Sequence, residues 1–306
     1  MTHRAWRKLD GTALAELAVA DVAPGDDRVL VAVEGAAVGP WGATPRGRVP
    51  GVAAVGRVIA CGGAATEWMD ARVLVPTLSP CGECDRCRRG GAAMCPDGAS
   101  HGVDGPGALA SALTAAARWL VRLDPPLDLA GPAVAALGGE LALAYALYAR
   151  IGVGPREPTI IAGGGVVARA AAAILAAKGA PVSADMSEHD VRRPRKVIVT
   201  DAARLAETLA LAGPRATIAV LTAPGFGGGS VDLDLRAAMA QEITLTGVAG
   251  CHPDLVPELV ALAVRGDLDL ASMTEVVALD ELESRLKARG DQPADTTLVV
   301  AMPSYL

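Results

Sequence analysis

Four cysteines packed into fifteen positions constrain this chain more than any other feature. The segment CGECDRCRRGGAAMC has the spacing C-x2-C-x2-C-x7-C and supplies Cys81, Cys84, Cys87 and Cys95. Four thiolates satisfy the tetrahedral preference of zinc and leave no open position, as in structural rather than catalytic sites. Because metal binding to such a polar, glycine-rich lobe contributes folding free energy, we expect one structural zinc ion per chain.

Free thiols, a disulfide pair and an iron–sulfur cluster are the alternatives to zinc at this cluster. Cys95 is followed by Pro96, but this matches only part of the run that holds clusters in bacterial ferredoxins. Six cysteines, four of them clustered, do not resemble a disulfide framework spread through a large chain. Cys61 and Cys251 lie outside the cluster and are expected to be ordinary small apolar residues.

The charge balance argues against several classes of function. A net charge of -6 and an aromatic content of 3% provide neither a basic surface nor a stacking platform for nucleic acid. No apolar run is expected to cross a bilayer, and the start MTHRAWRKLDG lacks the apolar stretch of a secretory signal. We therefore expect a cytoplasmic protein with a small-molecule substrate and neither nucleic-acid nor membrane partners.

The sequence pattern changes near Gly131. Before it, short β-branched runs separated by Gly and Pro turns predict an all-β part, at 28–33, 55–60 and 72–75. After it, a strand at 159–162 runs into a glycine-rich turn and an apolar helix, which is the opening of a βαβ unit. Further strands are expected at 196–200, 216–221, 243–248 and 296–303. A chain of 306 residues is long enough for two domains, so we predict an α/β fold with a β domain and a mainly parallel sheet.

The glycine-rich turn fits the dinucleotide-binding pattern G-x-G-x-x-A. Gly163 would permit the sharp bend, Gly165 the approach of a pyrophosphate, and Ala168 close helix packing. Asp185, about 20 residues on, fits the acid that binds the ribose and favours NAD(H) over NADP(H). The alternative is that nearby arginines bind a 2′-phosphate; these are Arg192, Arg193 and Arg195.

This cysteine lobe, placed between a β-rich start and a dinucleotide turn, resembles the zinc-containing alcohol dehydrogenase branch of the medium-chain dehydrogenase/reductase superfamily. The stretches GDDRVLVAVEGAAVG, DARVLVP and LKARGDQPADTTLVVAMP support a resemblance over nearly the whole chain. It implies a GroES-like β domain over 1–136, with the zinc lobe at 76–98 and completed by 272–306, and a Rossmann domain over 137–271. It also implies a homodimer formed through the edge strand at 243–248.

One departure from the family concerns the Rossmann sheet. Too few residues lie between Asp185 and the strand at 196–200 for the helix, strand and helix that the family carries there, since a βαβ unit takes about 30 residues. We therefore predict a shortened sheet. The missing elements normally wall the adenine pocket, so the shortening weakens or abolishes cofactor binding if nothing replaces them.

A second departure is the loss of the catalytic zinc ligands that the family carries. Val38 stands at the position of the Cys ligand, Val52 at that of the His and Gly139 at that of the third ligand. Pro40 replaces the hydroxyl residue of the proton relay and Ala53 the Glu beside the His ligand. These side chains offer no lone pairs to zinc, so no catalytic metal site is expected. The four histidines are isolated in sequence and are not expected to be ligands; they are His3, His101, His189 and His252.

We therefore predict an NAD(P)H-dependent oxidoreductase without catalytic zinc, acting on an electrophilic enone, quinone or carbonyl compound. The expected pocket residues are Val38, Trp41, Val52 and Gly139. Glu140, beside Gly139, is either an exposed or capping helix residue or an acid–base group in the vacated pocket. The alternative is a non-redox scaffold or a repurposed enzyme, because fold does not fix function.

Overall fold

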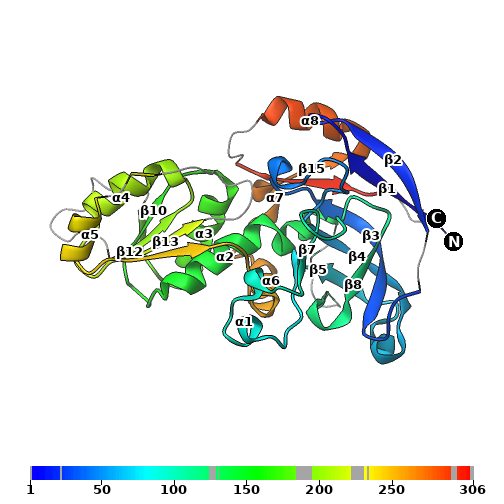
Figure 1. Ribbon diagram of the computed structural model, residues 1–306, viewed down its shortest axis with the longest axis horizontal. Helices are drawn as coiled ribbons and strands as arrows, with labels where there is room; N and C mark the ends of the chain where they lie inside the picture. Colours follow the sequence, from blue (N-terminus) through cyan, green and yellow to red (C-terminus); the bar gives the residue numbers. More distant parts are fainter. Residues whose placement is uncertain are drawn as a thin grey trace.

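The protein has two lobes joined by a central helical segment (Figure 1). The computed structural model describes residues 2–20, 23–123, 129, 131–183, 195–221, 231–232, 234–290 and 295–303. One lobe is rich in antiparallel strands and contains both ends of the chain, and the other contains a parallel sheet (Figure 1). The predicted α/β fold, with a strand-rich lobe and a second lobe built on a parallel sheet, is confirmed.

A seven-stranded sheet forms the β lobe, with the order β15-β16-β3-β4-β5-β9 and β8 paired to β3. Its strands are β3 (Arg28–Ala37), β4 (Ala53–Cys61), β5 (Arg72–Val75), β8 (Ala112–Ala116), β9 (Val121–Arg122), β15 (Thr274–Ala278) and β16 (Thr297–Ala301). The C-terminal strand β16 runs antiparallel to β3, with Val299 opposite Ala37, and β15 runs parallel to β16. Strands from the first and the last parts of the chain, β3 and β16, therefore pair in one sheet. The predicted domain boundaries remain predictions.

Shorter elements complete the β lobe. An antiparallel hairpin of β1 (Thr2–Lys8) and β2 (Leu14–Ala20), not predicted from the sequence, lies next to α8 (Leu282–Arg289) (Figure 1). The hairpin is anchored by the buried Trp6, whose N–H donates to the Leu109 carbonyl at 3.0 Å. The 3-10 turns of this lobe are η1 (Trp41–Ala43), η2 (Gly63–Trp68), η4 (Ala117–Trp119) and η8 (Leu279–Glu281).

The four cysteines lie on a projecting lobe that two short strands close at its base. These strands, β6 (Leu78–Ser79) and β7 (Ala99–Ser100), pair antiparallel with Leu78 opposite Ser100. Between them the chain forms only α1 (Asp85–Arg88) and η3 (Ala92–Met94). Of the four cysteines only Cys87 is buried, and the helix and turn are too short to bury a core of their own. This supports the expectation that the lobe depends on a bound metal.

The central segment consists of η5 (Pro132–Gly138) and α2 (Glu140–Ile151). Together they are long and apolar enough to cross a membrane by length and composition, contrary to the expectation that no such run exists. The segment is, however, 67% buried inside the protein, because it packs between the two lobes. Its hydrophobicity is thus explained by the protein core.

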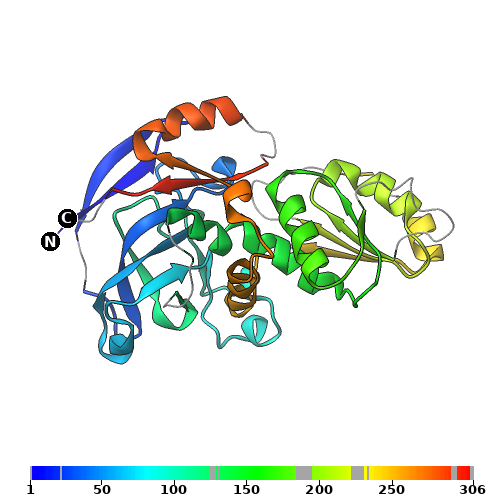
Figure 2. The ribbon, with the colours of Figure 1, turned by 180° about the vertical axis from the view of Figure 1, so that it is seen from behind.

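The parallel sheet has the order β11-β10-β12-β13-β14. Its elements in chain order are β10 (Thr159–Ala162), α3 (Gly165–Ala177), β11 (Val182–Ser183), β12 (Lys196–Val199), η6 (Ala202–Arg204), α4 (Leu205–Leu211), β13 (Thr217–Leu221), α5 (Leu235–Ala240) and β14 (Thr244–Val248). The helices α2 and α3 cover one face (Figure 2), and α4 and α5 pack on the other. Alternate residues such as Ile160 and Ile161 enter the two cores, so both faces of the sheet are buried.

The sheet is short on the side of β11, as predicted. Among the described strands, the two-residue β11 is the last on that side, and no strand lies beyond it. Asp185, Arg192 and Arg193 lie outside the described residues. Arg195 is exposed just before β12, at the amino edge of the sheet, whereas Gly163 follows the carboxyl end of β10. Arg195 therefore lies at the opposite edge of the sheet from the glycine turn.

Three further helical elements lead the chain back to the β lobe: η7 (Pro253–Leu255), α6 (Val256–Val264) and α7 (Leu270–Met273). Arg169, one turn into α3, links these returning segments to the helix that follows the glycine-rich turn. Its guanidinium donates to the carbonyls of Asp295 at 2.7 Å and Ser272 at 3.2 Å. The first turns of α3 therefore lie against the segments that flank β15 and β16.

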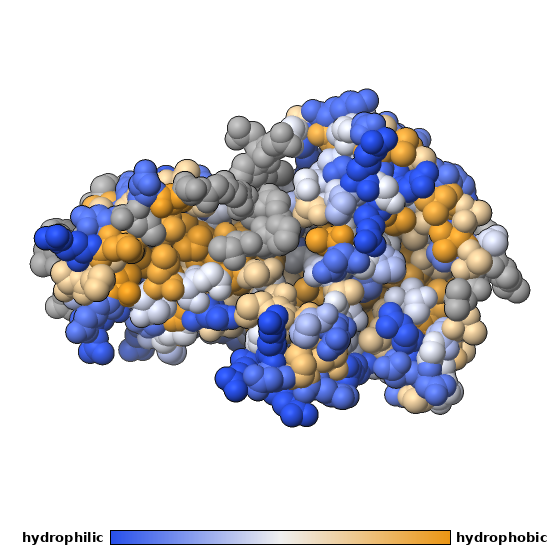
Figure 3. All heavy atoms as spheres, in the orientation of Figure 1, coloured by the Kyte–Doolittle hydropathy of each residue, from blue (hydrophilic) through white to orange (hydrophobic). Residues whose placement is uncertain are grey.

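The free edge of β14 carries the predicted dimer contact. No described strand pairs with its outer edge, and apolar surface gathers on this lobe (Figure 3). The exposed large apolar side chains of α5 and β14 are Leu235, Met239 and Leu245. The Thr244 N–H donates inward to Ala216, so the next N–H, that of Leu245, points outward. We propose that two copies pair through this edge in an isologous contact.

Leu245→Pro should therefore weaken dimerisation by about tenfold or more, about 1.4 kcal/mol, because Pro removes an outward donor but no bond to β13. Sedimentation of the wild type should give twice the 30.9 kDa chain mass, and the variant should dissociate at higher concentration with an unchanged thermal midpoint. Val264→Lys, which also replaces an exposed apolar residue but on α6, serves as the control. A wild type that is monomeric at every concentration contradicts the proposal.

Candidate functional site

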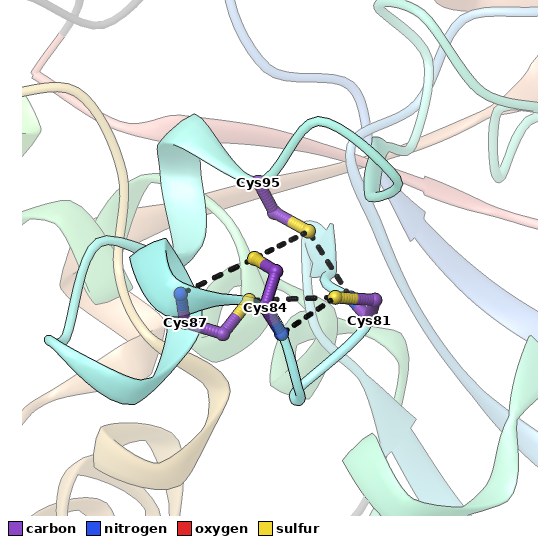
Figure 4. A group of neighbouring side chains, drawn as sticks. All are labelled: Cys81, Cys84, Cys87 and Cys95. Atoms are coloured by element: carbon purple, nitrogen blue, oxygen red, sulfur yellow. Dashed lines mark hydrogen bonds between the residues drawn. The ribbon is translucent and has the colours of Figure 1, made fainter.

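The four cysteine sulfur atoms converge on one point (Figure 4). All lie within 4.8 Å of one another, and the Cys81–Cys87 and Cys84–Cys95 pairs are each 3.9 Å apart. A tetrahedron with zinc–sulfur bonds of about 2.3 Å has sulfur atoms about 3.8 Å apart. The donor set and its spacing therefore fit a closed zinc site. Among the described residues, no other group of three or more His, Cys, Asp or Glu side chains has such an arrangement.

Backbone amides donate hydrogen bonds to the cysteine sulfur atoms and so favour the thiolates that a cation would bind. The N–H of Cys84 donates to the Cys81 sulfur at 3.4 Å, and that of Cys87 donates to the Cys84 sulfur at 3.5 Å. The backbone donors of Glu83 and Cys84 lower the pKa of Cys81 to about 6, whereas burial raises the pKa of Cys87 to about 12. Zinc binding requires all four thiolates, so the metal must displace protons, above all from Cys87.

The cysteine lobe also supports one wall of the cleft between the two main lobes. The Trp119 indole N–H donates to the Pro80 carbonyl at 2.8 Å, and its ring meets His252 edge-on at 5.8 Å. A Cβ built on Gly250 would lie 3.0 Å from Leu78 and 3.1 Å from Ala93. The loop after β14 is thus packed directly against the lobe.

The cleft has an empty volume of about 620 Å³, counting the part open to solvent, and lies where the β lobe, α2 and the loop after β14 meet. Its lining is mostly small and apolar: Pro40, Ala43, Val52, Pro76, Thr77, Leu78, Ser100, Val103, Gly138, Gly139, Glu140, Ala142, Leu143, Ala249, Gly250, Cys251 and Val256. Such a lining suits an apolar small molecule with few polar groups.

The structure brings together two of the three vacated ligand positions. A Cβ built on Gly139 would lie 3.2 Å from Val52 Cγ2, and one on Gly39 would lie 2.6 Å from Val52 Cγ1. The Val52 side chain thus fills the space between two glycines. Val38, also predicted to line the pocket, is instead 1% exposed in the core of the β lobe.

Trp41 does not line the cleft either, contrary to the prediction. Its indole N–H donates to the Gly11 carbonyl at 2.8 Å, and the Lys8 ammonium lies 4.9 Å from its ring. The ring is therefore held by the hairpin of β1 and β2, which the sequence analysis did not foresee. None of the described histidines lines the cleft, and His189 lies outside the described residues.

Glu140 lines the cleft at the first position of α2, beside Gly139. Burial raises the pKa of its carboxyl above the ordinary value, and the Thr297 hydroxyl and the charge of Arg289 only partly offset this effect. Because Glu140 is the first residue of α2, the helix N-terminus also favours the ionised carboxylate and so opposes the effect of burial. Glu140 is thus a partly enclosed acid facing the cleft, not an exposed helix residue.

Sequence reasoning missed three polar side chains of the lining, those of Thr77, Ser100 and Cys251. The Thr77 hydroxyl donates to the Gly138 carbonyl at 2.8 Å, and the Cys251 thiol is buried with a pKa raised to about 12 by burial. Cys251 follows β14, and residues beyond the carboxyl ends of parallel strands commonly face ligands. That position was the available signal, but the fold was needed to show which residue after β14 turns inward.

The glycine turn has the backbone that the nucleotide motif requires. Gly163 and Gly165 have φ values of 131° and 78°, in the region that favours glycine. A Cβ on Gly163 would lie 2.3 Å from the Thr200 hydroxyl oxygen, whereas one on Gly164 would meet nothing within 4 Å. Ala168 is buried in α3. The turn and the helix N-terminus therefore fit a pyrophosphate.

Residues 10–125 match the alcohol dehydrogenase GroES-like domain family. A curated relative, 2-dehydro-3-deoxy-L-galactonate 5-dehydrogenase of Pseudoalteromonas atlantica (strain T6c), is 34% identical over 111 residues. This match covers 36% of the chain and only 32% of the relative's length.

Solved structures resemble the complete chain. Acetophenone reductase from Geotrichum candidum in complex with NAD has a TM-score of 0.84 at 18% identity, covering 98% of this chain and 97% of that one. Alcohol dehydrogenase from Thermus sp. ATN1 has a TM-score of 0.84 at 20% identity, covering 98% and 100%. The cobalt- and zinc-bound alcohol dehydrogenase of Pyrobaculum aerophilum has a TM-score of 0.81 at 19% identity, covering 98% and 99%. These likenesses show the fold of the chain, and the match to the alcohol dehydrogenase GroES-like domain covers residues 10–125.

The cysteine cluster leads to a metal prediction. The purified protein should contain one zinc ion per chain, and Cys84→Ser should lose it and unfold at lower temperature, because structural zinc provides about 10–16 kcal/mol of apparent binding free energy. Elemental analysis and thermal melts with and without chelator measure both effects. Cys61→Ser, outside the cluster, should change neither. Iron in place of zinc, or a stable metal-free Cys84→Ser variant, contradicts the assignment.

Proposed function

We propose, from the alcohol dehydrogenase GroES-like domain and the dehydrogenase fold of the whole chain, that the protein is an NAD(P)H-dependent oxidoreductase that works without a catalytic zinc ion. The glycine turn carries this proposal. It combines two positive-φ glycines with open space at Gly164, at the carboxyl end of β10. Such a turn is needed to hold a pyrophosphate but is not needed to pack a helix on a sheet.

NAD(H) is the preferred cofactor in this proposal. The acid expected to bind the ribose, Asp185, follows β11, and a carboxylate there disfavours a 2′-phosphate. The exposed Arg195 at the opposite edge of the sheet does not favour NADP(H). The reduced nicotinamide, when bound, supplies a hydride to the substrate. The residues of this chain then have to bind, orient and protonate that substrate.

The substrate class follows from the lining of the cleft. Without Cys, His or a third ligand at Val38, Val52 and Gly139, no zinc ion acidifies a simple alcohol. An aldehyde, enone or quinone needs no such activation of its hydroxyl. The small apolar side chains around Val52 favour a compact apolar body on such a compound.

The second candidate function is a non-redox one, favoured by the short sheet beside β11. In that case the turn would be a remnant and the cleft would serve binding or unrelated chemistry. Cofactor binding separates the two functions, and a substitution at the turn makes the measurement specific.

Gly164→Val should weaken NADH binding by about tenfold or more, about 1.4 kcal/mol, because the added side chain enters open space in which the pyrophosphate is expected. Its φ of -143° and ψ of -164° are ordinary for Val, so the fold should persist. Fluorescence or calorimetric titration measures the affinity. Gly25→Val, in a loop of the β lobe, is the control. A wild type that ignores millimolar NADH and NADPH supports the non-redox alternative.

A substrate survey tests the chemistry. Oxidation of NADH with an enone, a quinone or an aldehyde should be unaffected by brief treatment with a chelator that leaves the structural metal in place, and simple alcohols should not be oxidised with NAD⁺. Absorbance of the reduced cofactor follows both reactions. Robust alcohol oxidation abolished by chelator would mean that a catalytic metal exists after all.

A further inference from the structure

Glu140 is the one carboxylic acid among the described lining residues of the cleft. It stands beside Gly139 and close to Val52, the two vacated ligand positions that face this cavity. The Thr77 hydroxyl is already donated to a backbone carbonyl, the Ser100 hydroxyl is a far weaker acid than a carboxyl, and the Cys251 thiol is a weak donor. Glu140 is therefore the strongest hydrogen-bond donor that the lining offers to a substrate oxygen, provided that it is protonated.

The groups around Glu140 suit a carboxyl that alternates between two protonation states. The Thr297 hydroxyl, fully buried at the start of β16, has no other hydrogen-bond partner among the described residues and faces this carboxyl. Arg289 of α8 is the nearby cation, but its charge is shared with Glu275 of β15 at 2.6 Å. Cys251, across the cleft, stays neutral because burial raises its pKa to about 12. Glu140 thus lacks a dedicated ion-pair partner.

Glu140 is also connected to the glycine-rich turn before α3, through Arg169 and the start of β16. Arg169, four residues after Gly165, donates to the Asp295 carbonyl, and Asp295 is two residues before Thr297. The start of β16 therefore lies between the first turns of α3 and the Glu140 carboxyl. Glu140 and the glycine turn are therefore linked through the start of β16.

We propose that Glu140 is the catalytic proton donor to the carbonyl oxygen of the substrate, in the place that a zinc ion holds in zinc-dependent relatives. This role rests on the proposed oxidoreductase function. A neutral carboxylic acid polarises the carbonyl by hydrogen bonding, as a metal does by coordination. Burial disfavours the charged carboxylate, and no ion-pair partner dedicated to Glu140 compensates for it. This combination keeps such an acid protonated at neutral pH.

Reduction of a simple carbonyl compound needs one hydride on carbon and one proton on oxygen. The substrate carbon gains the hydride and forms a C–H bond, and the C=O π pair moves to oxygen. That oxygen forms an O–H bond with the proton of Glu140, whose own O–H bond breaks. The substrate is reduced by two electrons and the nicotinamide is oxidised by two. Water returns a proton to the carboxylate, which the Thr297 hydroxyl and Arg289 stabilise meanwhile.

Glu140→Gln provides the kinetic test, since the amide has a similar size but no acidic proton. kcat for NADH oxidation should fall about 100-fold or more, with KM for NADH changed little. In the wild type, kcat should decline as the pH rises through the pKa of Glu140, because the acid form is the active one, and this decline should be absent from the variant. Glu258→Gln, an exposed glutamate on α6 paired with Lys178, is the matched control.

Infrared spectroscopy provides a readout that needs no turnover and no cofactor. The difference spectrum of wild type minus Glu140→Gln should contain a protonated carboxyl band at neutral pH, which disappears on raising the pH. Thr297→Val should move this disappearance to higher pH, because it removes a donor to the carboxylate. A wild-type carboxyl that is already ionised at neutral pH overturns the proposal.

The failures of the two proposals are distinguishable. If the wild type reduces carbonyl compounds and Glu140→Gln is equally fast with the same pH profile, the proton-donor role is wrong while the proposed function stands. If the wild type binds no nicotinamide cofactor and reduces nothing, the proposed function fails, and the role of Glu140 is overturned with it even where the infrared band is present.

Discussion

The burial of the segment η5–α2 between the two lobes is the interaction on which the rest of the structure depends. Its side chains join one core that runs from β3 and β4 to the parallel sheet, and the fully buried ones include Leu137, Leu141 and Leu147. Truncating any of these to Ala would cost about 2–5 kcal/mol, because neither lobe can close the resulting cavity alone. The same segment places Gly139 and Glu140 at the cleft, so the stability of the two-lobed fold and the geometry of the site have one source.

The cleft is packed rather than empty at the two positions where the family resemblance would place metal ligands and that line it, Val52 and Gly139. Val52 occupies the space beside Gly39 and Gly139, and a larger residue at either glycine would meet it. Neither Val52 nor Gly139 offers a side-chain lone pair to a metal, and Val52 fills the space beside the glycines. What remains is an apolar surface with one carboxyl, and such a surface can bind and polarise a carbonyl but cannot stabilise an alkoxide through a cation.

Much of the fold was predictable because its signals are local. The β-branched runs, the glycine turn and the cysteine spacing each specify a structure within a few residues. The predicted strands all appear, as β3, β4, β5, β10, β12, β13, β14 and β16. The site was less predictable, since it depends on which face a residue presents. Val38 points into the β-lobe core, where two register shifts between β3 and β4 decide orientation, and sequence alternation does not reveal them. Trp41 is held by a hairpin whose strands have little hydrophobic alternation, and Cys251 reaches the cleft only through a tertiary loop.

The cysteine lobe and the cleft are physically coupled, although they lie on different parts of the chain. Leu78 and Ala93 pack on Gly250, and the ring of Trp119, tied to Pro80, packs on His252. The segment 249–251 is thus held from outside by the lobe while it lines the cleft from inside. A lobe with few buried side chains can hold that wall in place only if something else fixes its own shape, and four convergent thiolates are the groups able to do so by binding a metal. Under the proposed function, a metal at the cysteines would maintain the wall of the cleft, and the chemistry in the cleft would need no second metal.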